Sequence, residues 1–332
     1  IEEAQKIQME ELANASASEL ENYQEQIANR DGEPLRLAET GAAVVLDVHT
    51  GEVLAMASYP DFDPNDFIEG MSTAEYNEKY NIDTSPLFNR AISSKATPGS
   101  IFKMVTALAG LEEGAVTLEE EIDDLGDFTK YDQTAYAPGC WTRYPQNHQD
   151  QNVTLALTNS CNIAFAQIAV MLGQETMIDY VTKYGFLSSH ELDGIGCASG
   201  TYPLDFVGDP ELGWSGIGQS TDTVCPYAML RYVCAIANGG TLIEPHMVSG
   251  EEPVTTALIE PATAKQLTQM MNYNVVDHYD GDVNFPGLKL CAKTGTAEQI
   301  ADKLQDFGVL VLSKPFTAVQ FRQAVQIAAS NY

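Results

Sequence analysis

The chain of 332 residues is 44% hydrophobic and 19% charged, a composition that is ordinary for globular proteins and argues against a disordered or fibrous chain. Its length suits one large domain or two ordinary ones. The 47 acidic residues outnumber the 17 basic ones and give a formal net charge of -30 at pH 7. Because such a charge repels phosphate groups, nucleic acid and anionic lipid headgroups are not expected partners.

Residues 1–40 predict a helical lead-in segment, with apolar residues recurring along residues 1–30 and the pair Asp31-Gly32 ending the helix. Two apolar runs at 42–48 and 53–57 then flank a short polar turn that contains Gly51. This pattern predicts a β-hairpin.

Further along, three apolar segments predict buried helices, and the second is interrupted by small polar residues at 159–162. An acidic segment at 117–127 lacks the alternating ligands of a calcium-binding loop, so we interpret it as a solvated face. A strand is expected near the end of the chain. The helices are predicted at 100–111, 154–173 and 225–238, and the strand at 289–297.

The six cysteines form no Cys-x-x-Cys pair, so we expect small buried residues rather than metal ligands, with a disulfide left open. The five histidines show no helical zinc-ligand spacing and accompany no Gly-x-Ser-x-Gly motif, which argues against a zinc site and a hydrolase triad. The sequence therefore predicts no metal.

Ser100 precedes Lys103 by three residues, a spacing that places both side chains on one helix face. A lysine with a lowered pKa can then accept the serine proton, which makes Ser100 a candidate nucleophile. Alone, the pair also fits a helix that begins with a capping serine and carries an exposed lysine.

Two further motifs follow in order, Ser160-Cys161-Asn162 and Lys293-Thr294-Gly295. Together with Ser100 and Lys103 they resemble the three active-site motifs of penicillin-binding proteins and serine β-lactamases. The segments 45–60, 217–219, 237–242 and 293–298 resemble the class B, monofunctional transpeptidases. This resemblance covers residues 41–298.

The resemblance implies an α+β fold of the β-lactamase/transpeptidase type, with an antiparallel sheet flanked by helices and an all-helical lobe. It also implies a D,D-transpeptidase that cross-links peptidoglycan stem peptides through a Ser100 acyl-enzyme and is trapped by β-lactams. No cofactor is implied. By resemblance the catalytic residues are Ser100, Lys103, Ser160, Asn162 and Lys293, and Thr294, Gly295 and Thr296 bind substrate.

In this implied mechanism Lys103 is the base, Ser160 relays a proton to the leaving amine, and Asn162 holds Lys103. The backbone amides of Ser100 and Thr296 would form the oxyanion hole. A side chain at Gly295 would obstruct a substrate lying on the strand. Carboxypeptidase or β-lactamase activity, a β-lactam sensor and an inactive scaffold stay open as alternatives.

Class B enzymes act outside the cytoplasm from a membrane anchor, sometimes within a cell-wall synthesis complex. Neither a signal peptide nor a run of roughly 18 apolar residues is present, but the chain begins with Ile1, so an anchor absent from this sequence stays open. Residues 299–332 depart from the family and resemble the end of a receiver domain, a strand at 307–312, the pair Lys314-Pro315 and a helix at 317–330.

Overall fold

The computed structural model describes residues 39–68, 70–124, 128, 137–140, 148–206, 208–250, 252–297 and 305–312. The predicted helices at 1–30 and 317–330 lie outside these residues. The described chain combines two long hairpins with a cluster of helices and several short two-stranded ladders. This α+β arrangement confirms the predicted fold class.

The first hairpin pairs β1 (Gly41–Leu46) antiparallel with β2 (Val53–Tyr59), as predicted. Its turn contains Gly51 at φ 82°. A Cβ there would lie 2.7 Å from the carbonyl oxygen of Glu244, so both the backbone conformation and the close approach require glycine.

The second hairpin pairs β9 (Leu290–Ala297) antiparallel with β10 (Gln305–Leu312) over eight residues of each strand. The strand predicted at 289–297 is therefore present and begins one residue later, at Leu290, and the strand predicted at 307–312 begins two residues earlier, at Gln305. β9 is also held by helix α11 (Pro261–His278), because Asn274 donates a hydrogen bond to the carbonyl oxygen of Ala292 at 3.0 Å. Among the described residues, no ladder joins the two hairpins, but both pack on helix α10 (Pro226–Ala237).

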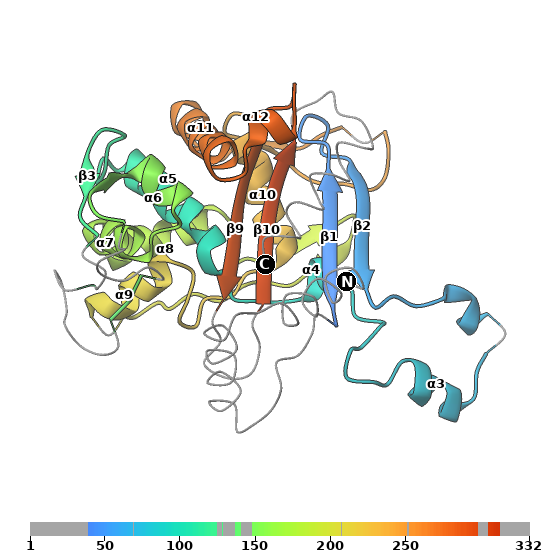
Figure 1. Ribbon diagram of the computed structural model, residues 1–332. Helices are drawn as coiled ribbons and strands as arrows, with labels where there is room; N and C mark the ends of the chain where they lie inside the picture. Colours follow the sequence, from blue (N-terminus) through green and yellow to red (C-terminus); the bar gives the residue numbers. More distant parts are fainter. Residues whose placement is uncertain are drawn as a thin grey trace.

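The helices form a lobe beside β9 (Figure 1). Its central helix, α5, is buried over most of its length and packs on α6, α7, α8 and α11. The helices of six or more residues that contribute buried side chains are α5 (Lys103–Glu112), α6 (Val153–Thr158), α7 (Asn162–Leu172), α8 (Gln174–Lys183), α9 (Asp209–Gly216), α10 (Pro226–Ala237) and α11 (Pro261–His278).

Proline at the first or second position starts α9, α10 and α11, where its missing N–H costs no helical hydrogen bond. The hydroxyl of Tyr232 on α10 donates to the backbone oxygen of Met104 on α5 at 3.0 Å. The lobe and the hairpins therefore share one core.

Short elements connect these parts, and α3 lies on an arm that extends away from the hairpins in Figure 1. They are η1 (Pro64–Phe67), α3 (Thr73–Lys79), α4 (Arg90–Ser93), η2 (Gly99–Phe102), β3 (Glu121–Ile122), β4 (Gln151–Asn152), β5 (His190–Leu192), β6 (Ile195–Cys197), β7 (Thr241–Ile243), β8 (Thr255–Ala257) and α12 (Gly281–Asn284).

The solvated face predicted at 117–127 is confirmed for most of its described acidic residues and is wrong for Asp124. The acidic segment 117–127 was expected to be a solvated face, and Glu119, Glu120 and Glu121 are exposed. Asp124, however, is fully buried, because the short β3–β4 ladder folds the segment back over the start of α7. Within the described part of the chain, no helix is both long and apolar enough to cross a membrane.

Candidate active site

Ser100 lies in η2, which continues directly into α5 at Lys103. The turn is fixed from outside, because the amide of Gly99 donates to the carbonyl oxygen of Gly218 at 2.9 Å. A Cβ on Gly218 would lie 2.4 Å from the carbonyl oxygen of Gly99, so only glycine permits this contact. The predicted helix start at Ser100 is confirmed, with a first turn of 3-10 geometry.

Ser160 and Asn162 lie at the break between α6 and α7, where the sequence predicted an interruption. Ser160 has a left-handed backbone, at φ 49°. Cys161 then caps α7 by accepting a hydrogen bond from the amide of Ala164 at 3.4 Å. This tight turn brings the backbone oxygen and hydroxyl of Ser160 and the amide side chain of Asn162 to the same amine.

That amine is Lys103 Nζ, which the structure places among four oxygens. It lies 3.0 Å from Ser100 Oγ and 2.7 Å from Asn162 Oδ1. The Ser160 backbone oxygen is at 2.6 Å and Ser160 Oγ at 3.2 Å. A neutral amine has two N–H groups and one lone pair, so it can donate to the two nearest oxygens and direct the lone pair at Ser100.

Lys103 is fully buried, and this burial lowers its pKa from 10.5 to about 8. Desolvation disfavours the charged form of an amine, which is the cause of the shift. A substantial fraction of Lys103 is therefore neutral near physiological pH and available as a base.

Lys293 on β9 approaches the same serine from the other side. Its Nζ donates to Ser160 Oγ at 2.9 Å and to the Thr294 backbone oxygen at 2.8 Å. Burial lowers the pKa of Lys293 well below its ordinary value, and the charge of Lys103 lowers it further. Ser160 Oγ thus bridges two buried amines.

The strand around Lys293 lies against η2. A Cβ on Gly295 would lie 2.8 Å from the amide nitrogen of Ile101 and 3.0 Å from the carbonyl oxygen of Pro98. The structure thus gives glycine a reason that the sequence did not indicate, since its missing side chain makes room for the nucleophile turn; the role toward substrate stays a prediction. This contact brings the Thr296 backbone beside the turn that carries the Ser100 amide.

The structure thus brings Ser100, Lys103, Ser160, Asn162 and Lys293 into one hydrogen-bonded group, with Thr294 and Gly295 along its edge. Of Thr296 only the backbone is described. Sequence reasoning missed two backbone groups, the Ser160 carbonyl and the Gly139 carbonyl, which accepts from Asn162 Nδ2 at 3.0 Å. Backbone carbonyls carry no residue signature that could have revealed them.

The profile of the penicillin binding protein transpeptidase domain matches residues 41–308. The chain belongs to the penicillin-binding protein transpeptidase family. The match continues ten residues beyond the resemblance seen in the sequence and includes the first part of β10.

Curated relatives are class B members of this family. The chain is 30% identical over 274 residues to stage V sporulation protein D of Bacillus subtilis, covering 78% of this chain and 40% of the relative. It is 29% identical over 286 residues to the peptidoglycan D,D-transpeptidase PbpA of Mycobacterium tuberculosis, covering 79% of this chain and 56% of the relative. The chain thus spans about half the length of these relatives.

Solved structures of the family have the same fold. Pseudomonas aeruginosa PBP2 aligns with a TM-score of 0.71 at 25% identity, over 93% of this chain and 76% of that one. A ceftriaxone acyl-enzyme of penicillin-binding protein A from Mycobacterium tuberculosis aligns with a TM-score of 0.71 at 25% identity, over 86% of this chain and 68% of that one. The α+β transpeptidase fold is thereby shown.

Proposed function

We propose that this chain is the catalytic part of a peptidoglycan D,D-transpeptidase that works through an acyl-enzyme on Ser100. The observation that carries the proposal is the buried amine of Lys103, 3.0 Å from Ser100 Oγ and fastened by Asn162 and the Ser160 carbonyl. The names of the curated relatives support the same reaction.

In the first step Ser100 Oγ attacks the carbonyl carbon between the two terminal D-alanines of a stem peptide, and its proton passes to the lone pair of Lys103. The developing oxyanion is stabilised by the amides of Ser100 and Thr296. In other enzymes one such donor contributes roughly 3 kcal/mol.

Collapse of this intermediate breaks the peptide bond and needs a proton on the leaving amine. Protonated Lys103 has a third N–H, and Ser160 Oγ lies 3.2 Å from its Nζ. Lys103 passes this proton to Ser160, which gives its own hydroxyl proton to D-alanine. The amine of a second stem peptide then attacks the acyl-enzyme and forms the cross-link. One of its protons passes through Ser160 and Lys103 to Ser100 Oγ as the ester bond breaks, which restores the free serine.

Lys293, Thr294 and Thr296 bind the terminal carboxylate of the substrate in this proposal. The buried ammonium of Lys293 supplies positive charge at Ser160, and the threonines supply hydroxyl donors. A β-lactam presents a similar carboxylate and acyl group, so it acylates Ser100 and is released slowly.

The substrate lies outside the cytoplasm, so we propose the same location for this domain, held there by an anchor outside this sequence. The match to family members that are named for peptidoglycan synthesis supports this location. A partner in a cell-wall synthesis complex is also proposed, since a related fold, Helicobacter pylori PBP2, is solved in complex with MreC.

The decisive experiment incubates one sample of the purified chain with a fluorescent penicillin and a separate, untreated sample with a stem pentapeptide and a D-amino acid acceptor. Wild type and Ser189→Ala, which alters an exposed serine, should be labelled and should exchange the terminal D-alanine. Ser100→Ala should do neither.

Each other outcome decides between functions. Labelling that persists in Ser100→Ala, or that is absent from folded wild type, contradicts the proposed nucleophile. Release of D-alanine without acceptor incorporation indicates a carboxypeptidase, and rapid loss of the label indicates a β-lactamase. Stable labelling with no peptide turnover indicates a β-lactam sensor.

A further inference from the structure

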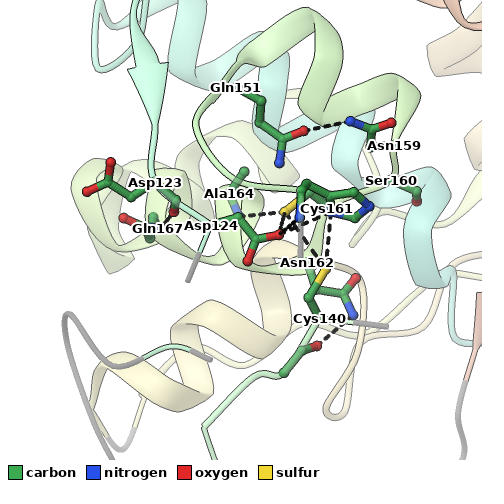
Figure 2. A network of polar contacts seen from close by, with 12 residues as sticks. Asp123, Asp124, Cys140, Gln151, Asn159, Ser160, Cys161, Asn162, Ala164 and Gln167 are labelled. Carbon is green, nitrogen blue, oxygen red and sulfur yellow. Dashed lines mark hydrogen bonds and ion pairs between the residues drawn. The ribbon is translucent and has the colours of Figure 1, made fainter. Parts of the chain in front are cut away.

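Four side chains with metal-ligating atoms meet beside the Ser160–Asn162 turn. Asp124 follows β3, His148 precedes β4, Cys161 caps α7, and Cys140 belongs to the described stretch 137–140. Their ligand atoms all lie within 4.8 Å of one another. Figure 2 shows Asp124, Cys140 and Cys161 pointing toward one another, with Ser160 and Asn162 alongside.

We propose that Asp124, Cys140, His148 and Cys161 form a structural zinc site. Two thiolates, one imidazole and one carboxylate are a donor set that zinc binds with four-coordinate, tetrahedral geometry. The site is independent of the acyl-transfer chemistry, and only its effect on that chemistry rests on the proposed function.

The distances between the ligand atoms fit such a tetrahedron. With metal–ligand distances of about 2.0 to 2.3 Å, the edges of a zinc tetrahedron are about 3.3 to 3.8 Å. The two sulfurs are 3.9 Å apart, and Cys140 Sγ lies 3.5 Å from His148 Nδ1. Asp124 Oδ2 lies 3.1 Å from both His148 Nδ1 and Cys161 Sγ. Small outward movements of the carboxylate complete the geometry.

Burial identifies the site as structural rather than catalytic. The side chains of Asp124 and His148 are 0% and 10% exposed, and Cys140 and Cys161 are 3% and 0% exposed. Four protein ligands leave no open position for substrate or water.

The ligands are connected to the active site through the backbone. Cys161 is the middle residue of Ser160-Cys161-Asn162, and Asn162 donates to the carbonyl oxygen of Gly139, the neighbour of Cys140. A metal that joins Cys140 to Cys161 therefore fixes both sides of Asn162. Through Asn162 Oδ1 and the Ser160 carbonyl it positions Lys103. These four ligands are positioning residues and do not touch the reacting atoms.

The first test measures zinc in the whole chain, purified without chelator from cells grown with zinc. We expect about one zinc per chain in wild type and in the control Cys197→Ser, which alters a buried thiol on β6. Cys140→Ser should retain less than about a tenth. Cys140→Asp keeps an anionic ligand and should recover zinc. Cobalt(II) added to apo-protein should give a thiolate-to-metal absorption band that is roughly halved in Cys140→Asp.

The second test measures the rate of acylation by fluorescent penicillin, below the melting temperature of every sample. Removal of zinc should slow wild type about tenfold or more, and added zinc should restore it. Cys140→Ser should be slow and unresponsive, and Cys140→Asp should respond as wild type does. The affinity for penicillin before acylation should change less than the rate, because the metal positions Lys103 rather than the ligand.

Three results would overturn the site. The first is a wild-type protein that contains less than about a tenth of a zinc per chain and whose six cysteines all titrate as free thiols. The second is a count of free thiols that is two lower and is restored by a reductant, which would identify a Cys140–Cys161 disulfide instead. Full zinc in Cys140→Ser would place the metal elsewhere. Zinc bound as expected without any penicillin labelling would contradict the transpeptidase proposal and leave the metal site intact.

Discussion

Acylation of Ser100 should depend on pH through the deprotonation of Lys103. Burial lowers the pKa of this lysine from 10.5 to about 8, and only the neutral amine can accept the serine proton. About 9% of the lysine is neutral at pH 7 and about 91% at pH 9. We therefore expect the rate constant for acylation by a fluorescent penicillin to rise about tenfold over this interval, with a midpoint near pH 8.

The assignment to Lys103 is tested by Asn162→Asp. A carboxylate at this position would lie about as far from Lys103 Nζ as the present amide oxygen, 2.7 Å, and would favour the charged amine. A neighbouring opposite charge raises a pKa by about 1 to 3 units. The midpoint should move upward by this amount, and the rate at pH 7 should fall about 10- to 1000-fold.

Asn152→Asp is the matched control for this substitution. Asn152 caps α6 by accepting a hydrogen bond from the amide of Leu155 at 3.0 Å, and aspartate caps a helix equally well. Its profile should follow wild type. The reasoning is refuted by a wild-type rate that is flat between pH 7 and 9, or by an Asn162→Asp midpoint that is unchanged or lower.

Three further substitutions separate stability from chemistry. Lys103→Met should stabilise the fold at pH 7 by up to about 3 kcal/mol in urea unfolding, since the folded pKa lies below the unfolded one. Wild-type stability should accordingly rise between pH 8 and 10.5, whereas that of Lys103→Met should not. Equal curves of stability against pH would contradict the free-energy cost of burying the charged amine. Gly295→Ala should slow penicillin labelling at least tenfold and destabilise by about 1 to 3 kcal/mol, because its Cβ meets the amide of Ile101 at 2.8 Å. Gly196→Ala, which has open space, is its control, and similar losses in both would exclude a specific clash. The free energy of unfolding of Ser160→Gly in urea should exceed that of Ser160→Ala by about 1 kcal/mol, because glycine adopts the left-handed φ of 49° without strain. Equal urea midpoints would show that this turn is unstrained.

Local patterns in the sequence were sufficient for the first hairpin, for helices α5 and α10, for the break between α6 and α7 and for strand β9. The turn residue Gly51 and the polar break at 159–162 each act within a few residues of their position. The long helix α11, which holds β9, was not predicted. Three short motifs also identified the catalytic group. The structure brings these motifs together, although the function of each residue stays a prediction until it is tested.

Features that depend on contacts between distant segments could not be predicted in this way. Asp124 is an acidic residue in an acidic segment, and only the β3–β4 ladder shows that it is buried. The four proposed zinc ligands likewise come from separate segments at 124, 140, 148 and 161. Their spacing fits no metal-binding motif, which is why the sequence led us to expect no zinc site.

The two buried lysines must share their charge, and this sharing gives the proton path its direction. Both amines lie within hydrogen-bond distance of Ser160 Oγ, at 3.2 and 2.9 Å, so they are at most about 6 Å apart. Two unit charges at this distance repel by roughly 3 kcal/mol at an effective dielectric constant of ~20, or about two pKa units.

Before reaction, the low pKa of both groups therefore favours a single proton, and a bound carboxylate would draw it to Lys293. When Lys103 takes the proton of Ser100, both amines become charged at once. The repulsion is relieved only when Lys103 releases that proton. Asn162 and the Ser160 carbonyl are fixed contacts, and Ser100 Oγ, 3.0 Å from Nζ, is by then bonded to the substrate carbon, so the acceptor that is left is Ser160 Oγ at 3.2 Å. In the proposed mechanism the second lysine thus drives the proton toward the leaving amine instead of back to Ser100.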